Sequence, residues 1–176
     1  ISTGNYCLNY AVSGDFHKGF PLEGKMTLLA GESGSSKSYI ACGSCIKWCQ
    51  QNGVQVIVLD TEHALDSNWI RKVGVDPTAD NILRVGVGLI DDMTAVIMGF
   101  LAQYKADYKD TPFEEKPPIL FIIDSFGMST TAVEMKHSEE GNNKGDMGLK
   151  QKQLYSLCRT FMASIGDNPI GMLCTQ

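Results

Sequence analysis

Five short apolar runs, separated by segments of helical period, constrain the fold of this 176-residue chain more than any other feature. Each run is apolar almost throughout, and the five span residues 25–30, 54–60, 82–86, 119–124 and 170–175. Continuous runs of this kind are typical of strands that are covered on both faces of a parallel sheet. Helices are predicted between them at about 37–51, 66–73, 91–107 and 147–166. The alternation predicts an α/β protein with a mostly parallel central sheet, helices on both faces and right-handed crossovers.

Composition limits the classes of protein that fit this pattern. The chain is 43% hydrophobic and 20% charged, and its length predicts one domain with its own core. Because no apolar run approaches the roughly 20 residues of a membrane span, no membrane partner is expected. The net charge of −5 is not that of a general polyanion binder, although one loop can still contact nucleic acid. The run at 170–175 ends abruptly, which indicates a piece of a longer protein.

Three of the six cysteines share one helical face. Cys42, Cys45 and Cys49 are spaced i, i+3 and i+7 in the first predicted helix. They are either ligands of a metal or cluster, or small buried residues that pack the helix on the sheet. The lack of a fourth ligand at suitable spacing favours packing. Unpaired thiols indicate a reducing compartment, so a cytoplasmic location is predicted, which is the host cytoplasm if the protein is phage-encoded.

A glycine- and serine-rich segment joins the first predicted strand to the first predicted helix. A strand, such a turn and a helix start bring backbone N–H groups together on an anion. In this pattern Lys37 reaches the β- and γ-phosphates of a nucleotide, and the Ser38 hydroxyl binds Mg²⁺. The usual pattern has glycine before the lysine, where this chain has Ser36, so an ordinary flexible connection is the alternative. The predicted phosphate-binding residues are Gly31, Glu32, Ser33, Gly34, Ser35, Ser36, Lys37 and Ser38.

Acidic residues follow two further apolar runs. Ligands of open parallel sheets bind beyond the carboxyl ends of the strands. Asp124 ends the run 119–124 and is predicted to hold Mg²⁺, the alternative being a helix cap. Glu62 follows the run 54–60 and can polarise a water for attack on the γ-phosphate, the alternative being a solvated acid. His63 is expected to pack rather than to bind a metal. For Trp69, core packing and stacking on a base are equally open.

The residues around Glu62 resemble a known family. The segments 60–66 (Asp-Thr-Glu-His-Ala-Leu-Asp) and 71–76 (Arg-Lys-Val-Gly-Val-Asp) resemble segments of the bacterial RecA recombinases. Residues 18–25, 146–149 and 173–176 match the family in order and spacing as well. The altered phosphate loop is more similar to phage recombinases of the UvsX type. The resemblance covers essentially the whole chain.

The resemblance implies a RecA-like P-loop NTPase fold with ATP and Mg²⁺ as cofactors. Glu62 falls on the catalytic glutamate, which activates the attacking water. Lys37 falls on the phosphate-binding lysine. Ser38 and Asp124 fall on the Mg²⁺ ligands.

The remaining site residues are also implied by the resemblance. Asp66 matches a residue that contacts the adenine amino group, and Trp69 falls where the family stacks an aromatic ring on adenine. Gln176 matches the glutamine that senses the γ-phosphate and passes its presence to the DNA-binding loops.

The resemblance further implies a DNA-binding surface. The polar segment 134–146 falls on the first of two DNA-binding loops, with Lys136, His137 and Lys144 as candidate phosphate contacts. Acidic residues in the same segment oppose them, and a disordered polar turn is the alternative. The second DNA loop, the C-terminal part of the core and an N-terminal oligomerisation element are expected outside residues 1–176. Residues of a neighbouring subunit complete the ATP site, so this chain alone is expected to bind ATP better than it hydrolyses it.

The implied function is a DNA-dependent ATPase that forms a helical filament on single-stranded DNA and exchanges strands with double-stranded DNA during recombination and repair. Mediator and single-strand-binding proteins are possible further partners. Two alternatives share the same site residues. One is a RecA-fold hexameric helicase or clock-type ATPase. The other is an ATP-binding scaffold that does not hydrolyse its nucleotide.

Overall fold

The five predicted strands form one sheet in the computed structural model, which describes residues 1–63, 65–141 and 148–176. The strands run in the order β1-β5-β4-β2-β3, and every neighbouring pair is parallel. The predicted α/β fold is therefore confirmed, with a wholly parallel sheet within the described residues. The strands are β1 (Met26–Leu29), β2 (Gln55–Asp60), β3 (Ile82–Gly86), β4 (Ile119–Asp124) and β5 (Ile170–Thr175).

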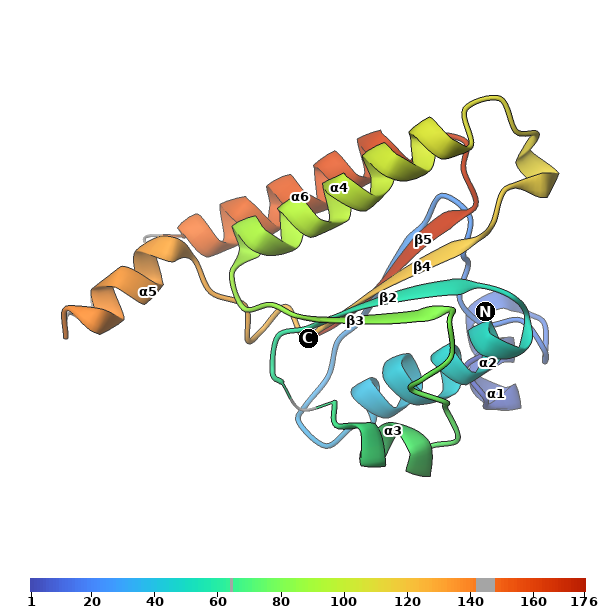
Figure 1. Ribbon diagram of the computed structural model, residues 1–176. Helices are drawn as coiled ribbons and strands as arrows, with labels where there is room; N and C mark the ends of the chain where they lie inside the picture. Colours follow the sequence, from blue (N-terminus) through green and yellow to red (C-terminus); the bar gives the residue numbers. More distant parts are fainter. Residues whose placement is uncertain (64, 142–147) are drawn as a thin grey trace.

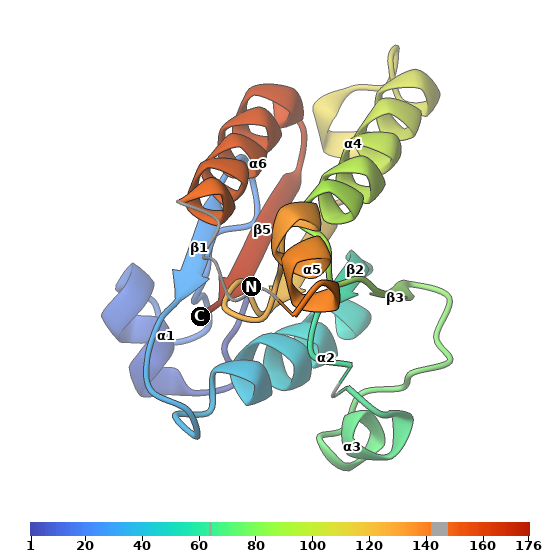
Figure 2. The same ribbon diagram turned by 90° about the vertical axis from the view of Figure 1, so that its left-hand side faces the viewer.

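Helices cover both faces of this sheet (Figure 1). On one face, α4 (Ile90–Asp107) and α6 (Leu149–Ile165) lie side by side, as Figure 2 shows from a second direction. The other face carries one continuous helical segment that begins as the π-helix η1 (Tyr39–Cys45) and continues as α2 (Ile46–Gln51). The short helix α3 (Ser67–Lys72) lies beyond it, and the 3₁₀ turn η2 (Phe113–Glu115) precedes β4.

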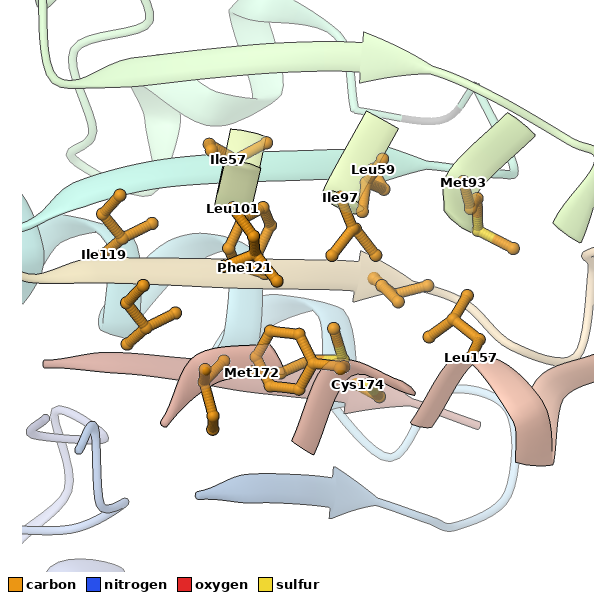
Figure 3. Close-up of a cluster of buried hydrophobic side chains, with 14 of the residues drawn as sticks. Ile57, Leu59, Met93, Ile97, Leu101, Ile119, Phe121, Leu157, Met172 and Cys174 are labelled. Carbon is orange, nitrogen blue, oxygen red and sulfur yellow. The ribbon is translucent and has the colours of Figure 1, made fainter. Parts of the chain in front are cut away.

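The larger apolar core lies between the sheet and the helices α4 and α6 (Figure 3). Phe121 points from the sheet towards Ile97 and Leu101 of α4, Met172 of β5 belongs to the same cluster, and all four side chains are buried. Phe121 also meets Phe161 of α6 edge-on, with 5.9 Å between the ring centroids. Aromatic pairs in this arrangement stabilise a core beyond the area they bury. This packing fixes the strands relative to one another, so their carboxyl ends lie along one edge of the sheet.

The predicted packing role of the three helical cysteines is confirmed. Cys42, Cys45 and Cys49 are fully buried against the second face of the sheet. The described residues contain no group of three His, Cys, Asp or Glu side chains arranged to hold a metal ion. All six cysteines lie within the described residues and are free thiols.

The helix α1 (Tyr6–Ser13) was not predicted from the sequence. The Asn5 side chain accepts a hydrogen bond from the Leu8 N–H at 3.0 Å, which caps the start of the helix. Gly14 ends it with a φ of 76°, a left-handed conformation that glycine adopts without strain. Both caps are readable in the sequence, but the helix has only eight residues.

The prediction of a continuous polar loop over 134–146 is wrong for its first half. The helix α5 (Ala132–Glu139) occupies it and projects from the body of the protein (Figure 1). Thr131 and Glu134 form a capping box, in which each side chain accepts from the other residue's backbone N–H, at 3.0 and 3.1 Å. Two satisfied N–H groups stabilise a helix start that has no apolar stripe.

In the described part of the chain, no helix is both long enough and apolar enough to cross a lipid bilayer.

Gly171 lies in the central part of the sheet where no side chain fits. A Cβ atom there would lie 2.2 Å from the backbone oxygen of Leu22, on the segment that leads into β1. We expect Gly171→Ala to lower the free energy of unfolding by about 3 kcal/mol, because the backbone must move. Gly99→Ala is the matched control, since a Cβ on that exposed position of α4 meets nothing within 4 Å. It should raise stability by about 1 kcal/mol. Urea unfolding measures both, and equal stabilities would contradict the packing described.

Candidate functional site

A cavity of about 630 Å³ lies at the carboxyl ends of β1, β4 and β5. It brings together segments from both halves of the chain. Of the residues predicted to bind phosphate, all but Glu32 line it, as do Glu62, Asp124 and Gln176. The complete lining is Gly31, Ser33, Gly34, Ser35, Ser36, Lys37, Ser38, Tyr39, Glu62, Asp124, Ser125, Gly127, Met128, Thr175 and Gln176.

The predicted phosphate loop between β1 and η1 turns through two left-handed residues. Gly34 has a φ of 80°, and Ser36 has a φ of 67°. A left-handed conformation costs a residue with a Cβ about 1 kcal/mol, whereas glycine adopts it freely. This explains physically why phosphate loops usually have glycine at the position of Ser36. The chain nevertheless keeps the glycine-like conformation there.

Lys37 carries the positive charge of the loop. Its ammonium group donates hydrogen bonds to the carbonyl oxygens of Gly31 and Glu32, both at 2.7 Å, and lies 3.4 Å from Ser35 Oγ. These contacts hold the ammonium across the loop that lines the cavity. A cation and a row of turned backbone amides at one place favour an anionic ligand.

Asp124 ends β4 as a buried carboxylate. Its Oδ1 accepts hydrogen bonds from Ser38 Oγ at 3.0 Å and from Thr175 Oγ1. Its Oδ2 lies 3.7 Å from the Sγ atom of Cys42. Burial raises the pKa of the Cys42 thiol well above its ordinary value, and the Asp124 charge raises it further.

The Ser38 and Asp124 pair has the chemistry of a magnesium site. Magnesium prefers oxygen ligands and is usually held by one or two protein groups together with substrate phosphates. Because the Ser38 hydroxyl donates a hydrogen bond to Asp124, its lone pairs remain available to a cation. The residues therefore fit Mg²⁺ bound jointly with a nucleotide.

Glu62 is an exposed carboxylate that is held from one side. Its Oε1 accepts a hydrogen bond from Ser125 Oγ at 2.9 Å. Ser125 is fixed in turn by Thr61, whose hydroxyl donates to the Ser125 carbonyl and accepts from its N–H, both at 2.8 Å. The peptide bond between Asp124 and Ser125 is cis. The hydrogen bonds between Thr61 and Ser125 join the ends of β2 and β4, with Glu62 at the cavity.

Ser125 was missed as a site residue. Its only sequence signal is its position directly after Asp124, which does not show that its hydroxyl meets Glu62. The contact joins two segments that are far apart along the chain, so it became visible only in the fold.

Gln176 follows β5 beside the start of the phosphate loop. Its N–H donates to the Leu29 carbonyl at 2.9 Å, and the Gly31 N–H donates to the Gln176 carbonyl at 3.2 Å. The hydrogen-bond ladder of β1 and β5 thus continues into the loop. The Gln176 residue lines the cavity, whereas its sensing role stays a prediction.

Asp66 and Trp69 lie outside the cavity lining, Asp66 directly before α3 and Trp69 within it. Asp66 Oδ1 caps this helix by accepting from the backbone N–H groups of Trp69 and Asn68, at 2.8 and 2.7 Å. These hydrogen bonds, the one from Trp69 first, lower the pKa of Asp66. Trp69 is half-buried against the apolar cluster on the sheet face that carries η1 and α2. Their predicted contacts with adenine are not tested by these positions.

His63 is an exposed residue that follows the end of β2. Its ring lies against Gly86 at the end of β3, where a Cβ atom would come within 2.9 Å of His63 Cε1.

The candidate DNA contacts lie away from the cavity. Lys136 and His137 occupy the last turn of α5, and the Lys136 ammonium lies 4.0 Å from Glu140 Oε1. Lys144 lies outside the described residues.

Three known proteins are similar to part of this chain. "Protein RecA" of Chlorobaculum parvum is 37% identical over 76 residues, which are 43% of this chain and 20% of that protein. "Protein RecA" of Chlorobaculum tepidum is 38% identical over 79 residues, 45% of this chain and 21% of the relative. "Protein RecA" of Malacoplasma penetrans is 33% identical over 78 residues, 44% and 22% of the two chains.

The matched part of the chain spans about a fifth of the length of these curated relatives. No protein-family model matches the chain. The phage subgroup stays a prediction. The wholly parallel α/β architecture fits a RecA-like fold, and the sequence similarity supports a relationship between this chain and the RecA family.

Proposed function

We propose that this chain is the ATP-binding core of a DNA-dependent ATPase of the RecA type. In this proposal the whole protein, of a phage UvsX-like subgroup, assembles as a filament on single-stranded DNA and promotes strand exchange in recombination and repair. The observation that carries the proposal is the convergence of Lys37, Asp124, Glu62 and Gln176 on one cavity. Its support from outside the chain is the similarity to RecA proteins.

ATP binding in this proposal begins with the phosphate loop. The turned backbone around Gly34 and Ser36 and the Lys37 ammonium neutralise the β- and γ-phosphates. Ser38 and Asp124 would hold Mg²⁺. When bound, this ion offsets the charge that develops on the phosphate oxygens.

Glu62 acts as the general base. Its Oε1 accepts the hydrogen bond from the Ser125 hydroxyl, so Oε2 is the atom that we propose to meet the attacking water. The water oxygen forms a bond to the γ-phosphorus as the bond to the ADP oxygen breaks, and the water proton passes to Glu62. The carboxylic acid then returns the proton to solvent or to the released phosphate. We propose that Gln176, which follows the carboxyl end of β5, contacts the γ-phosphate.

The adenine ring of ATP would be recognised by residues at the start of α3. Asp66 Oδ1 serves the helix cap, so Oδ2 is the atom that we propose for the adenine amino group. Trp69 stacks on the ring.

The DNA contacts follow the ATP site along the chain. Ser125, Gly127 and Met128 line the cavity shortly before α5, which carries Lys136 and His137. Lys136, His137 and Lys144 are proposed to contact DNA phosphates. Occupation of the cavity can therefore bias the segment that meets the DNA.

Electron microscopy of the full-length protein with single-stranded DNA and a non-hydrolysable ATP analogue tests the assembly. We expect helical filaments, and we expect single-stranded DNA to stimulate phosphate release from ATP. Closed rings in the absence of DNA would favour a helicase or clock-type ATPase. ATP binding without any phosphate release would favour the non-hydrolysing scaffold.

A further inference from the structure

Cys42 differs from the other cysteines of its helix because it touches the acidic end of β4. Its Sγ lies 3.7 Å from Asp124 Oδ2, and its side chain is fully buried. Ser38, four residues earlier in the chain, donates to the other oxygen of the same carboxylate. Two positions one helical turn apart thus contact the two oxygens of one carboxylate.

The three donors around Asp124 leave it little freedom. A carboxylate offers about four lone-pair sites, and Ser38, Thr175 and Cys42 use three of them. Without Cys42 the buried Oδ2 would lose its thiol donor, and a buried acceptor that lacks a partner is costly. The carboxylate could then rotate to share Ser38 and Thr175 between its two oxygens.

We propose that Cys42 is a positioning residue for the magnesium site. The inference rests on the proposed function, because it assigns Mg²⁺ to Ser38 and Asp124. The Cys42 S–H group holds Oδ2, so that Ser38 and Asp124 present their remaining lone pairs to the cation in one fixed arrangement. Outer-shell groups of this kind commonly change metal affinity by about 10- to 100-fold when they are removed.

Cys45 offers a matched control. It is equally buried on the same helical face, and its packing partners belong to the same core cluster. Cys42→Ala and Cys45→Ala each remove one buried sulfur atom from this face, but only the first removes a donor to Asp124. Cys42→Ser keeps a donor at the position.

The experiment measures binding of a fluorescent ATP analogue to the full-length protein, with Mg²⁺ titrated and with the metal removed by a chelator. We expect Cys42→Ala to raise about tenfold the Mg²⁺ concentration that gives half of the metal-dependent gain in binding of the ATP analogue. Binding without metal should be unchanged. Cys45→Ala should match the unmodified protein in both. Cys42→Ser should recover most of the Mg²⁺ response.

Each outcome supports or overturns the inference. An unchanged Mg²⁺ response in Cys42→Ala, or an equal change in Cys45→Ala, would overturn it. So would a loss of metal-free binding in Cys42→Ala that Cys42→Ser shares, because that pattern is one of general packing. If the unmodified protein bound no nucleotide, the proposed function itself would fail, and the inference with it. If the unmodified protein and Cys42→Ala bound the ATP analogue with the same Mg²⁺ dependence, the role of Cys42 would be wrong while the proposed function would stand.

Discussion

Glu62→Gln in the full-length protein is expected to lower ATP turnover at least about a hundredfold and to change ATP affinity by less than about twofold. The amide has the shape of the carboxylate, and its oxygen can still accept the hydrogen bond from Ser125. It cannot accept a proton from the attacking water at neutral pH. Phosphate release in the presence of single-stranded DNA measures turnover, and a fluorescent ATP analogue measures binding.

Glu115→Gln is the control for this variant. Glu115 is an exposed carboxylate of η2, at the amino end of β4 and outside the cavity lining. Its removal changes the net charge by the same amount and should leave both measurements unchanged. Normal hydrolysis by Glu62→Gln would show that the base assignment is wrong.

Lys37→Ala is expected to weaken ATP binding by about a hundredfold or more. The change removes a positive charge that contacts phosphate in the proposed function, and hydrogen bonds to charged groups contribute about 1.5–3 kcal/mol each. It also removes the hydrogen bonds from the ammonium to the Gly31 and Glu32 carbonyls, which hold the loop in shape. Titration with the fluorescent ATP analogue measures the loss.

Lys25→Ala separates this effect from a general loss of positive charge. Lys25 is exposed just before β1 and does not line the cavity. Its side chain can be removed while its backbone oxygen keeps the hydrogen bond from Met172 N–H. ATP affinity should be unchanged in this variant. If Lys37→Ala bound ATP within twofold of the unmodified protein, the loop would not be a phosphate site.

The positions of the five strands could be predicted from the sequence because both faces of the sheet are buried, whereas the strand order was not predicted. A run such as Ile119–Asp124 has no polar face, and few other structures accommodate it. The carboxyl-end rule of parallel sheets then placed Glu62 and Asp124 near the phosphate loop, and the cavity brings these residues together.

The contacts that refine the site could not be predicted. Thr61 with Ser125, and Cys42 with Asp124, join residues that only the packed fold brings together. For Cys42 the helical spacing indicated burial, but it did not show that the side chain reaches the end of β4. Asp66 is different, because an aspartate directly before a predicted helix is a local signal for a helix cap. This capping role could have been predicted from the sequence together with the adenine contact.

The hydrogen bonds between the phosphate loop and Gln176 have a consequence for the order of folding. The first N–H of the loop, on Gly31, is satisfied by a residue that follows the last strand, and that residue is held in turn by Leu29. Closing the long stretch of chain between β1 and β5 costs conformational entropy, and this cost opposes the pairing until the contacts between the two strands form. The loop therefore gains its final shape only when β5 has docked beside β1. If the chain binds nucleotide as proposed, its affinity for ATP therefore depends on the docking of β5 beside β1.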